Sequence, residues 1–405
     1  MSAIRDRTGA GGALANCVGR KRAAAGVRQQ DLASRVGISR QTLSVIEAGQ
    51  SVPSAAIALR LARSLGCPVE DLFWVDGPQA AITVEMGSDG GEVVGAGRGR
   101  APATANAATR VVLASIDGRW VAHRLAAEDP SSFLMAADGV IAGGGRGRAR
   151  SASAAPRVTP FADARLARDT LLCAGCAPAF GLLAARANTR PADQRVLWLE
   201  RSSGAALELL ARAQVHVAGT HLYDEEAREF NVPFVRRRFP GRSMLVVNLA
   251  RWEAGLVVAR GNPRRIRGVR DLARADVSFV RRLPGAAAQD LIDRLWRREG
   301  LGDGGAARTG VTARGHMEVA RLVALGVADA GVALPAVARA HDLDFIPLAE
   351  ERFDLVLARE LRADPRVVRL LETLSGRAFR HELESLGGHV MRDAGRIIAD
   401  TSPRA

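Results

Sequence analysis

The chain has 405 residues, and its 57 lysines and arginines against 43 aspartates and glutamates give a formal net charge of +14 at pH 7. This length predicts two or three domains, each able to bury a core, and excludes a lone small module. The positive charge favours a polyanionic partner without naming it. Four scattered cysteines exclude a disulfide framework, and the longest apolar run, 171–185, is shorter than the roughly 20 residues of a membrane span. We therefore expect a cytoplasmic protein with no membrane partner.

Residues 27–73 have the pattern of short helices joined by a tight turn. Gly37 can adopt the left-handed conformation that ends one helix, and Ser39 can cap the next. Apolar residues at helical spacing give each helix one buried face: Leu32 and Val36, then Leu43 and Ile46. The polar side chains at the start of the second helix then point away from the core, where a major groove would admit them.

Three further helices complete the predicted head. Pro53 opens an amphipathic helix that Gly66 ends, residues 69–73 form a short helix, and residues 14–25 supply the first one. The sequence therefore predicts an all-α head of five helices within residues 13–78.

The head resembles the Cro and phage-repressor (XRE-type) helix-turn-helix family at Gln29, Leu32, Ala33, Gly37, Ile38, Ser39, Ile46, Glu47, Gly49 and Pro53. The resemblance implies sequence-specific binding to a double-stranded DNA operator. It implies base or phosphate contacts by Gln29, Gln41, Thr42 and Ser44, and backbone contacts by Arg20, Arg28 and Arg40. Relatives usually place a serine or threonine cap at the position of Arg28, so the cap of the second helix is weakened while a phosphate contact is gained.

Residues 79–160 predict a small connector that contains β-strands. Residues 110–116 and 119–125 have the pattern of two strands around Asp117 and Gly118, which favours a hairpin. Stretches rich in glycine, alanine and arginine cannot bury enough surface to order themselves, and we expect disordered, solvated loops there. Nucleic-acid contact is an alternative for their arginines, which include Arg98, Arg100, Arg146, Arg148 and Arg150.

From about Thr159 short apolar strands alternate with helical segments. The strand candidates are 170–173, 196–199, 215–218, 245–248, 256–259, 277–280 and 330–333. Such alternation predicts parallel α/β layers, in which ligands bind where strand C-termini meet helix N-termini. Two of these joins, around Cys176 and around Ser202-Ser203, carry small polar residues whose amides and hydroxyls suit an anion.

Residues 161–400 resemble the two-lobed, type II periplasmic-binding-protein-like domain related to molybdate and tungstate receptors. The likeness is carried by AGCAPAFGLL (174–183), HVAGTHLYD (216–224), ARWEAGLVVARGNP (250–263), GVRDLARADVSFVRR (268–282), GHMEVARLVALGVADAGVA (315–333) and LDFIPLAEERFDLVL (343–357). It implies a first lobe of about 161–258 and 350–400, a second lobe of about 260–345, and a hinge near 259–263 and 348–357.

Carried over residue by residue, the resemblance implies a ligand site between the lobes. Lobe 1 would contribute Cys176, Ala177, Ser202, Ser203 and Thr220, and lobe 2 would contribute Arg282, Gly285 and His316. Two departures bear on the ligand. Relatives often have aspartate at Ala177, and after Arg282 they run Gly-Ser-Gly-Thr-Arg, where this chain has Gly-Ala-Ala-Ala-Gln at 285–289 and lacks two hydroxyls.

We expect no metal site, no cofactor and no catalytic centre. Cys173-x-x-Cys176 has no second cysteine pair, which favours a buried or turn role over redox or metal chemistry. His216 and His221 flank a strand end without a carboxylate at metal-ligand spacing. The two serines at 202–203 do not lie in a nucleophile elbow, so no enzyme activity is predicted.

These patterns predict a multidomain, dimeric transcriptional regulator. A flexible N-terminus (1–12) precedes the DNA-binding head (13–78), the connector (79–160) and a two-lobed α/β ligand-sensing domain (161–400). The favoured ligand is an oxyanion, molybdate or tungstate. One alternative keeps DNA binding but gives the second domain an organic-metabolite ligand or a non-sensing dimerisation role. Another is a metal-cofactor-assembly enzyme with a DNA-binding head.

Overall fold

The computed structural model of the protein describes residues 14–75, 80–88, 108–125, 130–141, 155–161, 164–189, 194–301 and 311–402. The chain forms two compact units, residues 1–80 and 81–405. The expected flexible N-terminus (1–12) and the glycine- and arginine-rich loops with Arg98, Arg100, Arg146, Arg148 and Arg150 lie outside the described residues. Within the described ranges, no helix is both long enough and apolar enough to cross a bilayer.

The first unit is built from four α-helices, one 3₁₀ turn and a two-stranded sheet. These are β1 (Leu14–Asn16), α1 (Val18–Ala24), α2 (Gln29–Val36), α3 (Arg40–Glu47), α4 (Ala55–Leu65), η1 (Val69–Asp71) and β2 (Phe73–Val75). The predicted helix-turn-helix is confirmed. Gly37 ends α2 with a φ of 73°, and the Ser39 hydroxyl accepts a hydrogen bond from the Thr42 N–H at 3.0 Å. Apolar side chains from all four helices share one core.

The five predicted helices are present as α1–α4 and the 3₁₀ turn η1, but the all-α prediction missed a short sheet, and the bounds differ at both ends of the head. Leu14–Asn16 is a strand because it pairs antiparallel with Phe73–Val75, and the Asn16 side chain accepts from the Val18 N–H at 3.2 Å, so α1 begins later. Val69–Asp71 is a single 3₁₀ turn because Pro68 precedes it and the strand pairing begins two residues after it.

The connector folds into a six-stranded sheet of order β3-β8-β7-β5-β6-β4. Its strands are β3 (Ile82–Thr83), β4 (Glu85–Met86), β5 (Thr109–Ile116), β6 (Arg119–Arg124), β7 (Gly139–Ile141) and β8 (Arg157–Pro160), and two short helices, α5 (Pro130–Leu134) and α6 (Arg165–Arg168), follow β6 and β8. The predicted hairpin is confirmed. Asp117 and Gly118 have φ values of 50° and 74°, as the type I′ turn of a two-residue hairpin requires.

Polar contacts fasten this sheet to the rest of the second unit. Arg195 makes a two-pronged ion pair with Asp138 at 2.8 and 2.9 Å. The His216 ring bonds to the Ser115 carbonyl at 3.2 Å, and the His123 ring bonds to the Gln214 carbonyl at 2.8 Å. Apolar residues of β5 and β6 also share a core with the following α/β region. The connector therefore belongs to one compact unit with that region.

The C-terminal region is a two-lobed α/β fold around a ten-stranded sheet with the main order β10-β9-β11-β18-β14-β17-β15-β16. Its strands are β9 (Thr170–Gly175), β10 (Arg195–Glu200), β11 (Val217–Thr220), β14 (Met244–Val258), β15 (Phe279–Arg282), β16 (Thr312–Ala313), β17 (Ala330–Ala333), β18 (Asp344–Ala358), β19 (His389–Val390) and β20 (Ile397–Asp400), and β12 (Tyr223–Asp224) pairs with β13 (Glu229–Phe230). Its α-helices are α7 (Pro178–Ala187), α8 (Ser203–Ala211), α9 (Val232–Arg238), α10 (Ala287–Arg298), α11 (His316–Ala324), α12 (Pro335–Ala340), α13 (Pro365–Ser375) and α14 (Arg377–Leu386).

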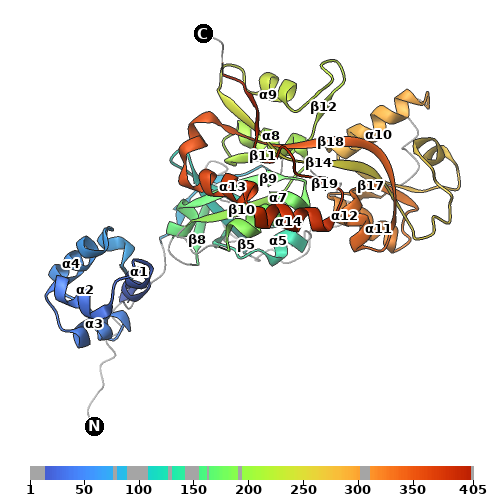
Figure 1. The fold of residues 1–405 in the computed structure, drawn as a ribbon. Helices are drawn as coiled ribbons and strands as arrows, with labels where there is room; N and C mark the ends of the chain where they lie inside the picture. Colours follow the sequence, from blue (N-terminus) through green and yellow to red (C-terminus); the bar gives the residue numbers. More distant parts are fainter. Residues whose placement is uncertain are drawn as a thin grey trace, which may run out of the picture. The chain divides into compact units, whose positions relative to one another are not determined.

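Two long antiparallel strands, β14 and β18, pass through both lobes (Figure 1). The strands predicted at 245–248 and 256–259 are one continuous strand, because β14 pairs with β18 along nearly its whole length. The pairing is irregular between Asn248 and Ala250 and between Ala254 and Gly255. Lobe 1 holds the parallel set β9, β10 and β11, and lobe 2 holds β15, β16 and β17. The core of lobe 2 begins at Ala254, earlier than the expected boundary near Val258.

Candidate functional site

The first candidate surface is the exposed start of α3. Arg40, Gln41 and Ser44 are exposed, and Thr42 is half-buried, whereas Leu43 and Ile46 on the opposite face are buried. The helix thus shows polar side chains to solvent and anchors its apolar side in the core. That division is what a helix inserted in a major groove requires.

A half-buried acid, Glu47, positions Gln29 beside α3. Glu47 accepts from the Gln29 side-chain amide at 3.0 Å and from the Arg22 guanidinium at 2.7 Å, and this contact raises the pKa of Arg22. The Gln29 carbonyl oxygen in turn accepts from Arg40 at 3.3 Å. Gln29 is therefore held at the interface between α2 and α3. Arg20 and Arg28 are exposed, and the Arg28 side chain makes no cap bond, as expected.

The second candidate site lies where the two lobes meet. Lobe 1 presents residues at strand C-termini and helix N-termini: Cys176 after β9, Ala177 before α7, Ser202 and Ser203 at the start of α8, and Thr220 at the end of β11. Lobe 2 presents Arg282 at the end of β15, Gly285 before α10 and His316 at the start of α11. The side chains of Ser203, Thr220 and His316 are completely buried.

Contacts between backbones close the lobes on each other. The Gly204 N–H, in the first turn of α8, donates to the Gly285 carbonyl at 3.2 Å. Gly285 has a φ of 81°, a conformation that favours glycine. On the other side, a Cβ at Gly315 would lie 1.8 Å from the Glu200 carboxylate, so a larger residue there would require the Glu200 side chain to move. The guanidinium of Arg294 also stacks 4.4 Å from the centre of the Tyr223 ring.

A chain of three buried polar groups runs from lobe 1 into the hinge strands. The His221 Nε2 lies 3.1 Å from the Cys176 sulfur, and the His221 Nδ1–H donates to Glu351 at 2.8 Å. Trp252 on β14 also donates to Glu351, at 3.4 Å. Burial lowers the pKa of His221, but the hydrogen bonds and electrostatic interactions with Cys176 and Glu351 outweigh it and raise that pKa to about 10. The arrangement holds an imidazole in a fixed orientation against a thiol.

His316 completes this cluster from the second lobe. It is fully buried, and neither ring nitrogen has a hydrogen-bond partner of ordinary geometry within the described part of the chain. Burial, with the nearby charges of Arg282 and His221, lowers the pKa of His316 well below its usual value, although a backbone contact with Val332 acts in the opposite direction. His316 is thus a neutral imidazole. Its ring centre lies 6.3 Å from that of His221.

Three further polar groups border the cluster. The Ser203 hydroxyl oxygen accepts from the His221 N–H at 3.2 Å, which leaves its proton available to another acceptor. The Thr220 hydroxyl has no hydrogen-bond partner in the described residues. Arg282 is buried and donates to the Arg314 carbonyl at 2.6 Å. A positive charge and hydroxyl donors therefore lie where the two lobes meet, at the seam between the lobes.

Sequence reasoning missed His221 and Glu351 as members of this site. It treated His221 together with His216, although the two rings make their contacts at opposite ends of β11. His216 accepts from the Leu172 N–H at 3.0 Å and bonds to Ser115, far from Cys176 in the fold. Glu351 lies 130 residues after His221, so no local spacing relates the two. Its position two residues before the buried Phe353 on a long apolar strand was the available signal.

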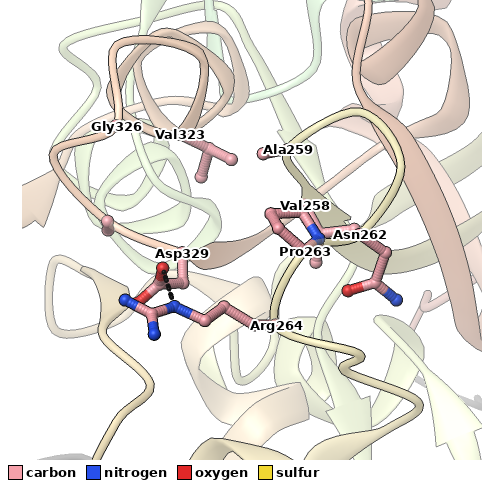
Figure 2. Close-up of a pocket in the computed structure, with 9 residues that line it drawn as sticks. Val258, Ala259, Asn262, Pro263, Arg264, Val323, Gly326 and Asp329 are labelled. Carbon is pink, nitrogen blue, oxygen red and sulfur yellow. Dashed lines mark hydrogen bonds and ion pairs between the residues drawn. The ribbon is translucent and has the colours of Figure 1, made fainter.

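A separate hollow of about 380 Å³ lies on lobe 2, at the end of α11 opposite His316. It is lined by Val258, Ala259, Asn262, Pro263, Arg264, Val323, Gly326, Ala328 and Asp329. Figure 2 shows Arg264 bonded to Asp329 at its edge, with a distance of 2.9 Å. Burial opposes ionisation there, but bonds from Ser278 and Arg264 hold the pKa of Asp329 below its usual value. None of the predicted ligand residues lines this hollow.

Comparisons with known proteins match both regions of the chain. A helix-turn-helix family model matches residues 18–72, and a PBP superfamily domain model matches residues 184–375. The HTH-type transcriptional regulator YgzD of Bacillus subtilis (strain 168), itself uncharacterized, is 38% identical over 63 residues, which cover 16% of this chain and 96% of that protein.

The C-terminal region has more distant relatives. The uncharacterized protein YvgK of Bacillus subtilis (strain 168) is 31% identical over 185 residues, 46% of this chain, and the match spans 59% of the length of that protein. Among solved structures, the periplasmic molybdate-binding protein of Azotobacter vinelandii has a TM-score of 0.42 and 16% sequence identity, covering 54% of this chain and 98% of that one.

Proposed function

Because the chain belongs to the HTH-type transcriptional regulators and carries a PBP superfamily domain, we propose that it is a regulator whose second domain senses a small oxyanion. Molybdate and tungstate are the first candidates. The head would bind an operator through Gln29, Arg40, Gln41, Thr42 and Ser44, with Arg20 and Arg28 on the DNA backbone. We propose that the chain acts as a homodimer in the cytoplasm, because two linked heads reading two half-sites gain specificity from their spacing.

The observation that carries the ligand proposal is the buried hydroxyl of Thr220. A buried polar group without a partner costs about 1–3 kcal/mol, so its retention calls for a reason. Thr220 ends β11, the strand after which His221 contacts Ser203, and Arg282 brings a buried positive charge from the other lobe. Hydroxyl and amide donors with one cation are the groups that bind oxyanions.

Closure of the lobes gives the proposed ligand a way to act on DNA. The Gly204 N–H already donates to the Gly285 carbonyl, so an anion at the start of α8 would compete with a contact between the lobes. Ligand binding would then change how the lobes meet at β14 and β18. A coupling of about 1–3 kcal/mol would change operator affinity about 5- to 150-fold.

The alanine-rich start of α10 after Gly285 favours a second candidate, an organic anion. The first turn of this helix supplies Gln289, whose side-chain oxygen accepts from the Arg282 backbone N–H at 2.9 Å, in place of the hydroxyls that relatives carry. A larger carboxylate ligand would need fewer hydroxyl donors and more room. The two candidates share the same lobes and differ in the donor set.

Calorimetric titration of the full chain, treated with EDTA, with molybdate, tungstate, sulfate and phosphate tests the proposal. We expect selective binding of one oxyanion and a shift of operator affinity measured with and without it. Heat with none of the four oxyanions would contradict the oxyanion proposal and leave the organic anion. Binding without any effect on DNA affinity would contradict the sensing role.

Thr220→Val separates a ligand-binding role from a structural one. Valine has nearly the same shape and removes only the hydroxyl, so we expect unchanged or slightly higher stability and a loss of about 1–3 kcal/mol in anion affinity. The matched controls are Thr170→Val and Thr373→Val, whose hydroxyls donate to the Leu166 and Arg369 carbonyls at 2.7 and 2.8 Å. These controls should lower stability and leave anion affinity unchanged. A stability loss in Thr220→Val without an affinity change would reverse the assignment.

A further inference from the structure

Three buried side chains gather potential metal ligands at the seam between the lobes. One ligand atom each of Cys176, His221 and His316 lies within 4.8 Å of the other two. Cys176 and His221 come from lobe 1, after β9 and β11, and His316 comes from the first turn of α11 in lobe 2. The three residues are at most 2% exposed. The grouping therefore depends on the two lobes being closed.

The donor set defines the kind of ion that would fit. A thiolate and two imidazoles are soft to borderline ligands, which select zinc or copper over magnesium, calcium or manganese. His316 supports this, because a buried ring whose nitrogens have no partner in the described residues has kept its donor capacity unused. Glu351 and Trp252 add the outer layer that metal-binding histidines usually have, since the carboxylate fixes Nδ1 of His221 and turns Nε2 toward Cys176.

We propose that Cys176, His221 and His316 bind one thiophilic d¹⁰ cation, Zn²⁺ or Cu⁺, between the lobes. In a tetrahedral zinc site with normal bond lengths, sulfur and nitrogen ligands are about 3.5 Å apart. The Cys176–His221 contact of 3.1 Å would open slightly, and the remaining separations, at most 4.8 Å, would shorten by up to about 1.3 Å. The Ser203 hydroxyl, 3.9 Å from the sulfur, lies beside this position.

The ion would act as a clamp on lobe closure, because it takes ligands from both lobes. Its binding does not depend on the oxyanion proposal, since the cation ligands are a thiol and two imidazoles rather than hydroxyls and a guanidinium. Any effect of the ion on operator affinity does rest on the proposed regulatory function. Metal binding is therefore measured first, without DNA and without oxyanions.

The first experiment uses the full chain, reduced and stripped of metal with EDTA. Zn²⁺ is titrated against a coloured zinc chelator, and Cu⁺ is titrated anaerobically against bicinchoninate, so that the two arms distinguish the ions. We expect one ion per chain. Co²⁺ in place of Zn²⁺ should give visible bands of a tetrahedral site and a near-ultraviolet thiolate-to-cobalt band, a readout that needs no variant. The absence of stoichiometric binding of both Zn²⁺ and Cu⁺ would overturn the proposal.

Variants then assign the ligands. Cys176→Ala and His316→Gln should each weaken binding by more than about 100-fold, beyond the 10- to 100-fold loss that we expect from Glu351→Gln, which removes an outer partner. The matched controls are Cys173→Ala, a buried thiol on β9 whose pKa burial raises, and His341→Gln in lobe 2. Circular dichroism checks folding. Affinity unchanged in both Cys176→Ala and His316→Gln, with the cobalt–thiolate band retained, would overturn the assignment.

Operator affinity, measured with and without bound metal, distinguishes the metal site from the proposed regulatory function. If the metal binds and operator affinity changes upon loading, the clamp acts through the regulatory function. If the metal binds with the expected ligand dependence and operator affinity stays constant, the metal site stands and the proposed sensing function loses this support. Loss of metal binding with intact oxyanion binding would overturn the metal site alone.

Discussion

The polar residues that matter in the head are exposed, whereas those at the seam between the lobes are buried. On α3 the side chains of Arg40, Gln41 and Ser44 are exposed, and water satisfies them until DNA arrives. At the seam, Cys176 and His316 are buried, and water does not reach them in the closed form. Exposed polar side chains therefore cost little free energy and are common, whereas each buried polar group needs a hydrogen-bond partner or a functional reason.

This difference decides where substitutions act. Replacing an exposed residue on α3 removes a contact with DNA and leaves the fold as it was. Replacing a buried, hydrogen-bonded residue at the seam changes both the stability of the fold and the geometry of the site.

Glu351→Ala should have the largest effect on stability. Glu351 is 2% exposed and accepts from both His221 and Trp252, so its removal leaves two buried donors without an acceptor. Breaking a buried polar pair costs about 3–5 kcal/mol, to be measured as the free energy of unfolding of the metal-free chain in urea. Glu350→Ala is the matched control, because that neighbouring side chain is 65% exposed and pairs with Arg251 on the surface. Equal losses in both variants would contradict the contrast between surface and seam.

Acid should weaken the fold through His216. Burial and the charge of Arg366 lower its pKa to about 4, while Ser115, Asp364 and Asp117 act in the opposite direction. His216 therefore takes up its proton near pH 6.5 in the unfolded chain and only near pH 4 in the folded chain. Stability is therefore complete above about pH 6.5 and falls, by an amount on the order of 3 kcal/mol, as the pH drops to about 4.

His216→Gln isolates this part of the pH dependence. Other buried histidines also titrate, so the measurement is the difference between wild type and variant in unfolding free energy, followed from pH 7.5 to pH 4.5. The variant should lose less stability over that range than the wild type. Parallel curves for the two proteins would show that His216 is not the titrating group.

The head could be predicted closely from the sequence because its determinants are local. Gly37 and Ser39 stand within three residues of the helix ends that they fix, and the apolar faces recur every three or four residues. The errors arose where a distant segment decides the outcome. Leu14–Asn16 has the composition of a helix start, but it is a strand because Phe73–Val75 pairs with it.

The seam could be predicted only in part for the same reason. Strand alternation indicated the strand-to-helix joins around Cys176 and Ser203, and the family resemblance indicated His316 ahead of a helix in the second lobe. They did not bring in Glu351, because its role comes from the course of β18 past β11, a pairing that no local pattern encodes. Likewise, the pattern around residues 245–259 does not distinguish two short strands from the single strand β14. The residues between the two predicted strands stay in β14, and only its pairing with β18 becomes irregular there, at Asn248 and Ala254.

Gln41→Ala should change DNA binding without changing the fold. Gln41 is exposed on α3, so its removal costs no packing, and we expect a loss of about 1–3 kcal/mol in affinity for the specific operator with little change on random DNA. Fluorescence anisotropy at fixed salt measures both affinities. The control is Gln30→Ala, also exposed but on α2. A similar loss on random DNA would assign Gln41 to the phosphate backbone instead of the bases.

Arg28→Ser should have the smallest effect and the opposite sign on stability. Arg28 holds the N-cap position of α2 with a φ of −70° and a ψ of 149°, and it makes no side-chain cap bond. Serine would supply that bond and add about 0.5–1 kcal/mol to the stability of the head, measured as its unfolding midpoint in urea. Removal of the exposed cation should at the same time weaken DNA binding and reduce its salt dependence. Ser39→Ala, which deletes a cap that α3 already has, should destabilise the head by about 1 kcal/mol. If Arg28→Ser were neutral for stability while Ser39→Ala were costly, the start of α2 would be fixed by its packing against α3, and only the DNA role would remain for Arg28.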